Sequence, residues 1–152
     1  NKPDEISYFK KISSLYYYKG GRYYLDANFN KELVDKMYSA LIPFSYENNY
    51  IMFVYRIKNQ PIGLFICEKI VTYEPFSNLL VAPLRFLVIE PKFRNKKVAY
   101  ILFVKFLEYL KDKSDIITTG LDIINLPSLN LHSKIGFKFN YTHNTYHWWN
   151  DF

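Results

Sequence analysis

Two separated segments carry residues whose types and spacing could do chemistry. In residues 88–99 an apolar run ends at Pro91, a basic loop follows, and a helix is predicted to begin near Val98. Backbone N–H groups at a helix N-terminus lack intrahelical partners, and the helix dipole makes that end positive, so anions bind there. Lys and Arg in the same turn add charge where a pyrophosphate would sit. Taken alone, the segment is more simply a solvated basic loop.

The second segment, residues 125–137, predicts a helix that follows a strand and carries polar side chains. Asn125 and Pro127 are typical of a helix start, because proline is favoured in the first turn. Gly136 is typical of the end, because glycine adopts the positive φ of a left-handed cap. Phe137 then returns the chain to the core. On its own this pattern occurs in many helices that precede a strand.

Together the two segments resemble the GNAT superfamily of acyl-CoA-dependent N-acetyltransferases. That family has a strand, Val-x-Pro, and then Arg/Gln-x-x-Gly-x-Gly/Ala at the start of a helix. A later strand is followed by Asn, a small residue, an aromatic residue and Gly-Phe. The matching residues here are Ile89-Glu90-Pro91, Arg94, Ala99, Asn125, Ser128, His132 and Gly136-Phe137. Two separated patterns that agree over Leu80 to Phe137 make the resemblance fairly specific.

The resemblance implies acetyl-CoA as co-substrate, with no metal. It implies a mixed α/β fold, in which a central, mostly antiparallel sheet contains a parallel splayed pair and is flanked by helices. The backbone of the splayed strand would pair with the pantetheine arm, and an N–H near Ile89 would polarise the thioester carbonyl. The implied coenzyme-binding residues are Leu87, Val88, Ile89, Arg94, Asn95, Lys96, Lys97, Val98, Ala99, Asn125 and Ser128.

Two positions depart from the family pattern. Lys97 stands where the signature has glycine, so a side chain occupies a point of close backbone approach to phosphate. Its ammonium could instead contact a phosphate of the coenzyme. His132 stands where many relatives carry a tyrosine that acts as general acid.

In the implied reaction an amine attacks the thioester carbonyl directly, so catalysis is mostly positioning and stabilisation of a developing oxyanion. The leaving thiolate takes a proton, and His132 is placed to give it, since a histidine pKa lies near ~6.5. The simpler alternative is that His132 only packs on a helix face.

The attacking amine must be neutral, so a base or a water chain is expected. Glu68, Glu74, Glu90 and His147 are candidates, and the sequence does not choose among them. We expect Glu68 to act together with His132 as the catalytic pair. Arg85, on the central strand, could hold an acidic group of the substrate, or form a surface ion pair.

A narrower resemblance lies outside the coenzyme motif. Arg22-Tyr23-Tyr24-Leu25-Asp26, a following helix with Tyr38, and a C-terminal Tyr146-His147-Trp148-Trp149 resemble bacterial TDP-fucosamine acetyltransferases. Those enzymes acetylate a nucleotide-linked amino sugar for polysaccharide biosynthesis. The substrate-binding residues that follow are Arg22, Tyr24, Arg85 and His147. The tyrosines could equally pack helices onto the sheet.

Composition narrows the class of partner. Net charge is +6 and aromatic residues make up 20%, which together suggest nucleic-acid binding. Lys, Asn, Tyr and Phe also rise together in AT-rich genomes, and four basic residues fall within residues 92–97 alone. The charge therefore predicts a local anion site and no nucleic-acid partner.

No apolar run reaches the roughly 18 residues of a membrane span, so no membrane partner is expected. The single cysteine, Cys67, favours a cytoplasmic setting and a buried thiol.

The element pattern predicts one domain over residues 1–152, which is compatible with being the C-terminal part of a longer chain. The expected helices are 4–15, 30–43 (capped by Asn30 and ended by Pro43), 98–111 and 125–135, and residues 22–25 are expected to be extended. The expected strands are 50–56, 62–71, 80–89, 116–122, 137–141 and 145–149. Strand, helix and strand over residues 80–122 form a βαβ unit, which implies parallel pairing.

The sequence thus predicts an N-acetyltransferase that uses acetyl-CoA and acts on the amine of an amino sugar, with a nucleotide-linked sugar favoured. Another small amine or a peptide N-terminus is the alternative acceptor. A non-catalytic binding module with a decayed coenzyme site is the alternative from a different class. The oligomeric state stays open, with a homodimer among the candidates.

Overall fold

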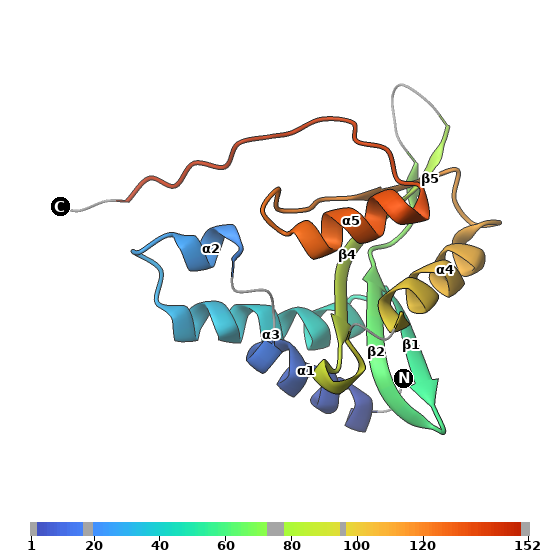
Figure 1. Cartoon of the computed structure of the whole chain (residues 1–152), viewed down its shortest axis with the longest axis horizontal. Coiled ribbons are helices and arrows are strands. Elements are labelled where there is room, and N and C mark those ends of the chain that lie inside the picture. Colours follow the sequence, from blue (N-terminus) through green and yellow to red (C-terminus); the bar gives the residue numbers. More distant parts are fainter. Residues whose placement is uncertain (1–2, 17–19, 73–77, 95–96, 150–152) are drawn as a thin grey trace.

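The computed structural model folds the chain around one mixed sheet (Figure 1) and describes residues 3–16, 20–72, 78–94 and 97–149. Glu74, Asn95 and Lys96 lie outside the described residues. The helices are α1 Pro3–Tyr16, α2 Arg22–Leu25, α3 Lys31–Glu47, α4 Val98–Leu110 and α5 Leu126–Ile135, with a short 3-10 turn η1 at Pro91–Phe93. The strands are β1 Ile51–Ile57, β2 Gln60–Cys67, β3 Val71–Thr72, β4 Leu80–Ile89 and β5 Ile116–Thr119.

The sheet has the order β1-β2-β4-β3, with β5 also paired to β4. β1, β2, β4 and β3 pair antiparallel, whereas β4 and β5 pair in parallel. The predicted fold class is therefore confirmed, including the parallel pair that the βαβ unit implied. The β1–β2 turn is tight because Lys58 and Asn59 both adopt positive φ, 47° and 64°, which matches the twist of the flanking strands.

Helices cover both faces of this sheet. α1 and α3 pack on one face, where Phe9, Tyr38 and Ile42 meet Phe86 and Val88 of the central strand. On the other face α4 brings side chains that contact the strands, with α5 beside it. That core consists of Ile62, Phe65, Cys67, Ala82, Leu84, Ile89, Val98, Leu102, Phe103, Phe106 and Leu110. Burial also raises the pKa of the Cys67 thiol to about 12, so this cysteine is a small core residue, as expected.

The central strand β4 contains a β-bulge at Arg85. Ile66 pairs with Phe86 and Cys67 pairs with Leu84, so Arg85 has no opposite residue on β2. One extra residue reverses which side chains face which layer. Ala82 and Leu84 face α4 before the bulge, and Leu87 and Ile89 face it afterwards. The bulge also leaves Arg85 exposed in the middle of the sheet.

Only one side of α4 is buried. Val98, Leu102 and Phe106 are in the core, but Tyr100 and Ile101 are 38% and 39% exposed. None of the helices in the described part of the chain is long and apolar enough to cross a bilayer.

Two predictions for the N-terminal half are wrong. Residues 22–25 were expected to be extended but form the single turn α2, in which the carbonyl of Gly21 accepts from the N–H groups of Tyr24 and Leu25. Helix α3 does not end at Pro43 but continues to Glu47. A proline inside a helix costs about 3 kcal/mol, and burial of Ile42 and its neighbours on the same face offsets that cost.

The predicted strands 137–141 and 145–149 are also wrong, because a strand requires a paired backbone. After Gly136 the chain is extended, yet residues 138–149 make no backbone hydrogen bond with the described residues. This C-terminal segment passes over α5 towards α2 (Figure 1). Two other strands are shorter than expected: β2 ends at Cys67, with β3 separate, and β5 ends at Thr119.

The core on the α4 face yields a stability prediction. Leu102 is fully buried against the sheet, whereas its neighbour Ile101 is 39% exposed. We expect Leu102→Ala to lower the free energy of unfolding by about 2–5 kcal/mol and Ile101→Ala to lower it by less than about 1 kcal/mol. Urea unfolding followed by circular dichroism measures both, and equal losses would contradict the one-sided packing of α4.

Candidate functional site

A cleft opens among the described residues where β4 and β5 diverge. Their parallel pairing ends at Leu84 opposite Thr119, and beyond this point a cleft of about 790 Å³ lies between β4, α4 and α5. The residues lining it include Phe65, Leu84, Arg85, Phe86, Leu87, Val88, Ile89, Arg94, Lys97, Ala99, Tyr100, Phe103, Thr119, Gly120, Leu121, Asp122, Asn125, Pro127, Ser128, Leu131, His132 and Lys134. Most of the predicted coenzyme-binding residues therefore meet in one place.

The first wall of the cleft is the open edge of β4. Residues 86–89 pair with β2 on one edge, and the other edge of residues 87–89 has no strand partner in the described chain. Unpaired N–H and C=O groups along a strand edge can bind an extended ligand that carries amides. Leu87, Val88 and Ile89, which the resemblance assigns to the coenzyme, all line the cleft.

The second wall is the N-terminus of α4. Val98 begins this helix, and although its side chain is buried, its N–H has no intrahelical acceptor and is available to an anion. Arg94 and Lys97 line the cleft beside it. Arg94 donates from Nε to the carbonyl of Ile89 at 3.1 Å, which fixes the arginine at the end of β4. This end of the cleft therefore offers backbone N–H donors and two cationic side chains, which are the groups that bind phosphate.

Lys97 occupies this turn in a left-handed conformation. Its φ is 59° and its ψ is 4°, at the cap position immediately before α4. Residues other than glycine lose about 1–2 kcal/mol in this region. The conformation explains why the family pattern has glycine here. Lys97 adopts this conformation despite its side chain.

The third wall is the start of α5. Asn125 caps this helix, because its side-chain oxygen accepts from the N–H of Ser128 at 3.3 Å. The amide nitrogen of Asn125 is then the group that it can offer to a ligand. A strand edge, a helix N-terminus and this amide fit a long ligand with amides at one end and phosphates at the other.

His132 lies in the cleft wall and is only 7% exposed. Its ring packs edge-on against Phe103 and Phe137, and its Nδ1 lies 2.7 Å from the carbonyl of Ser128. That carbonyl accepts a hydrogen bond from Nδ1–H, which leaves Nε2 for a group in the cleft. Burial lowers the pKa of His132 below its ordinary value, with the Ser128 hydrogen bond opposing the shift.

Glu68 and Arg85 form an ion pair next to the bulge. Arg85 Nε lies 2.5 Å from Glu68 Oε1, and Tyr50 donates to the same carboxylate oxygen at 3.4 Å. Arg85 lines the cleft and is 63% exposed, whereas Glu68 is 23% exposed and reaches the cleft rim through Arg85. The surface ion pair considered as the simpler alternative is therefore present, and it lies at the rim.

Glu90, a further candidate base, is tied to α1. Tyr8 donates to Glu90 Oε2 at 2.9 Å, and Lys92 pairs with Oε1 at 2.7 Å. Burial, with the hydrogen bond to Glu90, raises the pKa of Tyr8 to about 12. These contacts give Glu90 a structural role at the end of β4. The sequence contained no signal for Tyr8, because the two residues are 82 positions apart.

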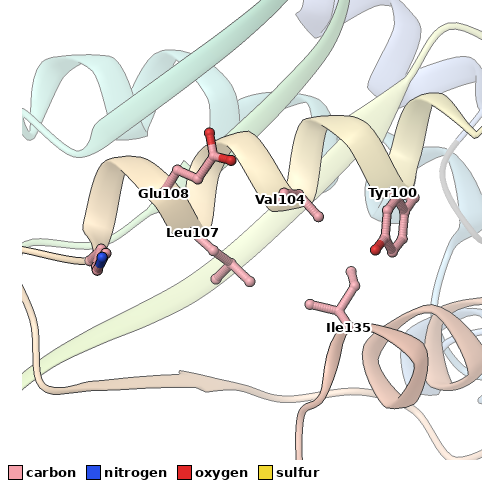
Figure 2. A pocket seen from close by; sticks show the side chains of 6 residues that line it. Tyr100, Val104, Leu107, Glu108 and Ile135 are labelled. Atoms are coloured by element: carbon pink, nitrogen blue, oxygen red, sulfur yellow. The ribbon is translucent and has the colours of Figure 1, made fainter.

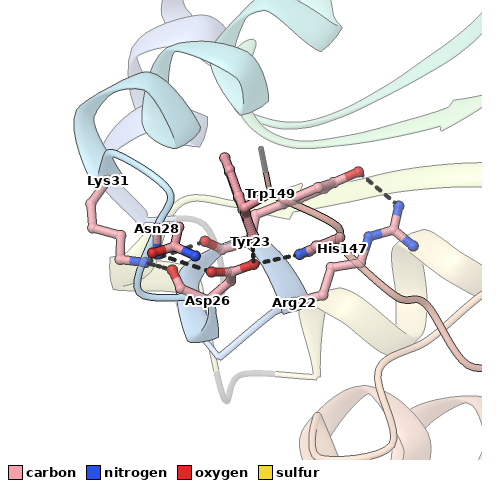
Figure 3. Close-up of polar contacts among 7 residues, drawn as sticks. All are labelled: Arg22, Tyr23, Asp26, Asn28, Lys31, His147 and Trp149. Carbon is pink, nitrogen blue, oxygen red and sulfur yellow. Dashed lines mark hydrogen bonds and ion pairs between the residues drawn. The ribbon is translucent and has the colours of Figure 1, made fainter. Parts of the chain in front are cut away.

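Three predicted substrate residues lie elsewhere, around α2 and the C-terminal segment. The Tyr24 hydroxyl donates to Asp35 and its ring stacks on Tyr38. Arg22 and His147 join a cluster centred on Asp26, shown in Figure 3, where His147 Nδ1 lies 2.6 Å from Asp26 Oδ2. Asp26 belongs to the Arg22–Asp26 motif, but nothing in the sequence indicates that it organises this cluster.

A smaller hollow of about 370 Å³ lies on the outer side of α4 (Figure 2). Tyr100, Val104, Leu107 and Ile135 make most of its wall, and its acid, Glu108, is paired with Lys105 at 2.8 Å. These residues offer apolar contact but no reactive group.

The left-handed conformation of Lys97 can be tested by Lys97→Gly. We expect a gain in stability below about 1 kcal/mol, since relief of strain exceeds the entropy that glycine adds to the unfolded chain. We expect affinity for the implied coenzyme to fall about 2- to 10-fold, because an ammonium beside the phosphates is lost.

The matched control is Lys58→Gly, since Lys58 also has positive φ, 47°, but lies in the β1–β2 turn. It should change thermal stability and leave coenzyme affinity unchanged. Calorimetric titration measures the affinities, and equal affinities for wild type and Lys97→Gly would place the phosphates elsewhere.

The lowered pKa of His132 predicts how stability depends on pH. The unfolded chain takes up a proton at this histidine below pH of about 6.5, whereas the folded chain does so only at lower pH. Stability should therefore fall as pH drops below about 6.5. Between pH 7.5 and 5.5, we expect His132→Gln to lose less free energy of unfolding than the wild type loses. The control His143→Gln, a change at an exposed histidine, should lose as much as the wild type. Urea unfolding at both pH values measures these losses. Equal losses in the wild type and in His132→Gln would contradict a lowered pKa at His132.

Comparison with solved structures gives the same fold. A putative acetyl transferase from Pyrococcus furiosus matches with a TM-score of 0.72 and 15% identity, over 95% of each chain. Aminoglycoside N-acetyltransferase AAC(6′)-Iy in complex with CoA matches with a TM-score of 0.65 and 12% identity, over 97% of this chain and 90% of that one. Ribosomal-protein-alanine N-acetyltransferase from Brucella melitensis matches with a TM-score of 0.65 and 11% identity, over 95% and 94%. A search of curated proteins finds no significant match.

The sequence itself matches a family model. Residues 14–137 match the acetyltransferase (GNAT) family, a range that contains β4, the N-terminus of α4, Asn125 and His132. The cleft lies within that range, and its strand edge and helix N-terminus agree with the coenzyme that the resemblance implied. The chain belongs to the acetyltransferase (GNAT) family, and it is an acetyl-CoA-dependent N-acetyltransferase.

Proposed function

We propose that this enzyme acetylates the amine of an amino sugar, and that the sugar is nucleotide-linked. The observation that carries the proposal is the Glu68–Arg85 pair at the bulge of β4, with the two groups 2.5 Å apart. It sets a carboxylate and an exposed guanidinium side by side at the rim of the cleft. An acceptor with both an amine and an acidic group complements that pair.

Bound in the cleft, acetyl-CoA supplies an activated thioester carbonyl. The open edge of β4 orients it, and a backbone N–H near Ile89 donates to the carbonyl oxygen as negative charge develops there. Glu68 accepts the proton of the incoming ammonium, and Arg85 holds the acidic part of the acceptor. Positioning by a rigid strand supplies much of the rate enhancement.

His132 completes the proton balance. The amine loses one proton and the departing sulfur gains one. The buried ring is neutral near pH 7, because burial lowers its pKa, and its Nδ1–H donates a hydrogen bond to the Ser128 carbonyl, so that Nε2 is the unprotonated nitrogen. Nε2 therefore takes up the proton released during attack before passing it to sulfur. Asn125 and Ser128 hold the pantetheine arm beside it.

Charge favours a nucleotide-linked sugar over a polyamine sugar. The protein has a net charge of +6, and Arg85 is 63% exposed at the cleft rim. Such a surface attracts a diphosphate and repels a polycation. AAC(6′)-Iy, with the same fold, acts on aminoglycosides, which supports an amino sugar as the broader acceptor class. A nucleotide-linked product would serve polysaccharide biosynthesis, as the narrower sequence resemblance implies.

An acceptor screen with acetyl-CoA tests the proposal. We expect turnover of nucleotide-linked amino sugars, and we expect Arg85→Gln to lower kcat/KM for them about 10- to 100-fold, the effect of losing one charge-assisted contact. Arg56→Gln is the matched control, because Arg56 pairs with Glu5 at 2.6 Å on the distant end of β1. It removes the same charge and should leave kcat/KM within about twofold.

The alternatives give distinct results. Preference for aminoglycosides over nucleotide sugars would show that the acceptor is a cationic sugar. Turnover confined to peptide N-termini would move the acceptor to the class of the Brucella protein. Failure to bind acetyl-CoA in calorimetry would mark a non-catalytic binding module.

A further inference from the structure

Gly120 is a glycine that neither its backbone conformation nor its packing requires. At Gly63 an added Cβ would lie 2.9 Å from Leu102 Cδ2, so the core excludes a side chain there. At Gly136 a φ of 107° favours glycine. The φ of Gly120 lies outside the left-handed region, and an added Cβ would meet no heavy atom within 4 Å apart from its chain neighbours. A side chain would therefore fit at position 120 in the folded chain.

The empty space beside Gly120 lies where β4 and β5 separate. The last pair of their parallel ladder is Leu84 opposite Thr119, and β5 ends there. Arg85 and Gly120 are the next residues along the two strands, and both line the cleft. A glycine in or beside a strand often marks a site where a ligand approaches the backbone closely. The space beside Gly120 is therefore part of the cleft, level with Arg85.

This space is distant from the phosphate-binding end of the cleft. Arg94 and Lys97, the two cations at the N-terminus of α4, follow Ile89 in the chain. Arg85 precedes Ile89 by four residues, which is about 13 Å along a strand. A coenzyme whose phosphates bind at α4 therefore leaves the end at Arg85 and Gly120 open to the other reactant.

We propose that the space beside Gly120 receives the sugar ring of the acceptor, so that Gly120 determines which acceptors the enzyme takes. The inference rests on the proposed function, in which Arg85 holds the acidic part of a nucleotide-linked amino sugar. The guanidinium of Arg85, 63% exposed, contacts the diphosphate, and the ring lies against the Gly120 peptide. Because Gly120 has no Cβ, the hydroxyl groups of the ring can approach that peptide closely. Gly120 thus contacts the acceptor and takes no part in proton transfer.

A size series at position 120 tests this role. One added methylene in a binding pocket changes kcat/KM by about 10- to 200-fold, so for a nucleotide-linked amino sugar we expect a loss of about 10-fold in Gly120→Ala and at least about 100-fold in Gly120→Leu. Affinity for desulfo-CoA, measured by calorimetry, should stay within about twofold of the wild type in both variants. An effect on the acceptor without an effect on the coenzyme is what the proposed position predicts.

The Tm of Gly120→Ala separates this role from a structural one. Alanine stabilises a protein where it adopts the native conformation without strain, because it restricts the unfolded chain. We therefore expect the Tm of Gly120→Ala to equal or slightly exceed that of the wild type. The matched control is Thr118→Phe, which adds bulk at an exposed position of the same strand that is not among the cleft-lining residues. It should leave kcat/KM within about twofold.

The outcomes separate this inference from the proposed function. A Gly120→Leu variant that acetylates nucleotide-linked amino sugars as fast as the wild type overturns the inference alone. So does a loss of desulfo-CoA affinity that grows with the size of the side chain, a lowered Tm in Gly120→Ala, or an equal loss of activity in the control. Should leucine unfold the chain, Gly120→Ala decides by the same measurements.

The wild type can also contradict the proposed function. If it acetylates aminoglycosides in place of nucleotide-linked sugars, the proposed function fails, and the size series on the aminoglycoside decides the inference by the same graded loss. A wild type that acetylates only peptide N-termini, or no acceptor at all, overturns both.

Discussion

The site depends on the short pairing between β4 and β5. These strands share only the register from Val81 opposite Ile116 to Leu84 opposite Thr119. If the parallel ladder continued, β5 would saturate the edge of residues 85–89 and no cleft would exist. Because the ladder stops, the outer edge of the central strand faces the cleft. The adjoining helices α4 and α5 place a helix N-terminus and the Asn125 amide at the same opening.

Three contacts hold the walls of that opening in place. Arg94 ties the basic turn to the carbonyl of Ile89, Tyr8 ties Glu90 to α1, and Asn125 caps α5. Main-chain groups form much of the polar surface of the strand edge and the helix N-terminus, and their positions depend on these side chains. A polar side chain outside the cleft can thus determine where the N–H groups at its wall point. Glu90 illustrates this, since it contacts α1 rather than the cleft while fixing the end of the strand that lines it.

Much of the fold and of the coenzyme side could be predicted from the sequence, because those features are local. The limits of β4 followed from apolar β-branched residues bounded by Pro91, and the left-handed end of α5 followed from Gly136. What could not be predicted depends on contacts between distant residues. Nothing near Pro43 signals that α3 continues, since the compensation comes from Phe9 and the sheet. The alternation at 145–149 does indicate a strand, but pairing requires a second backbone, which the described chain does not provide.

The contact between Asp26 and His147 has a consequence for how the protein is made. It joins residues 121 positions apart, whereas the lining of the cleft extends no further than Lys134. During synthesis from the N-terminus, every residue of the cleft is translated before His147. The Asp26–His147 contact can therefore form only after all the cleft residues have been synthesised, so it cannot guide the early steps of folding.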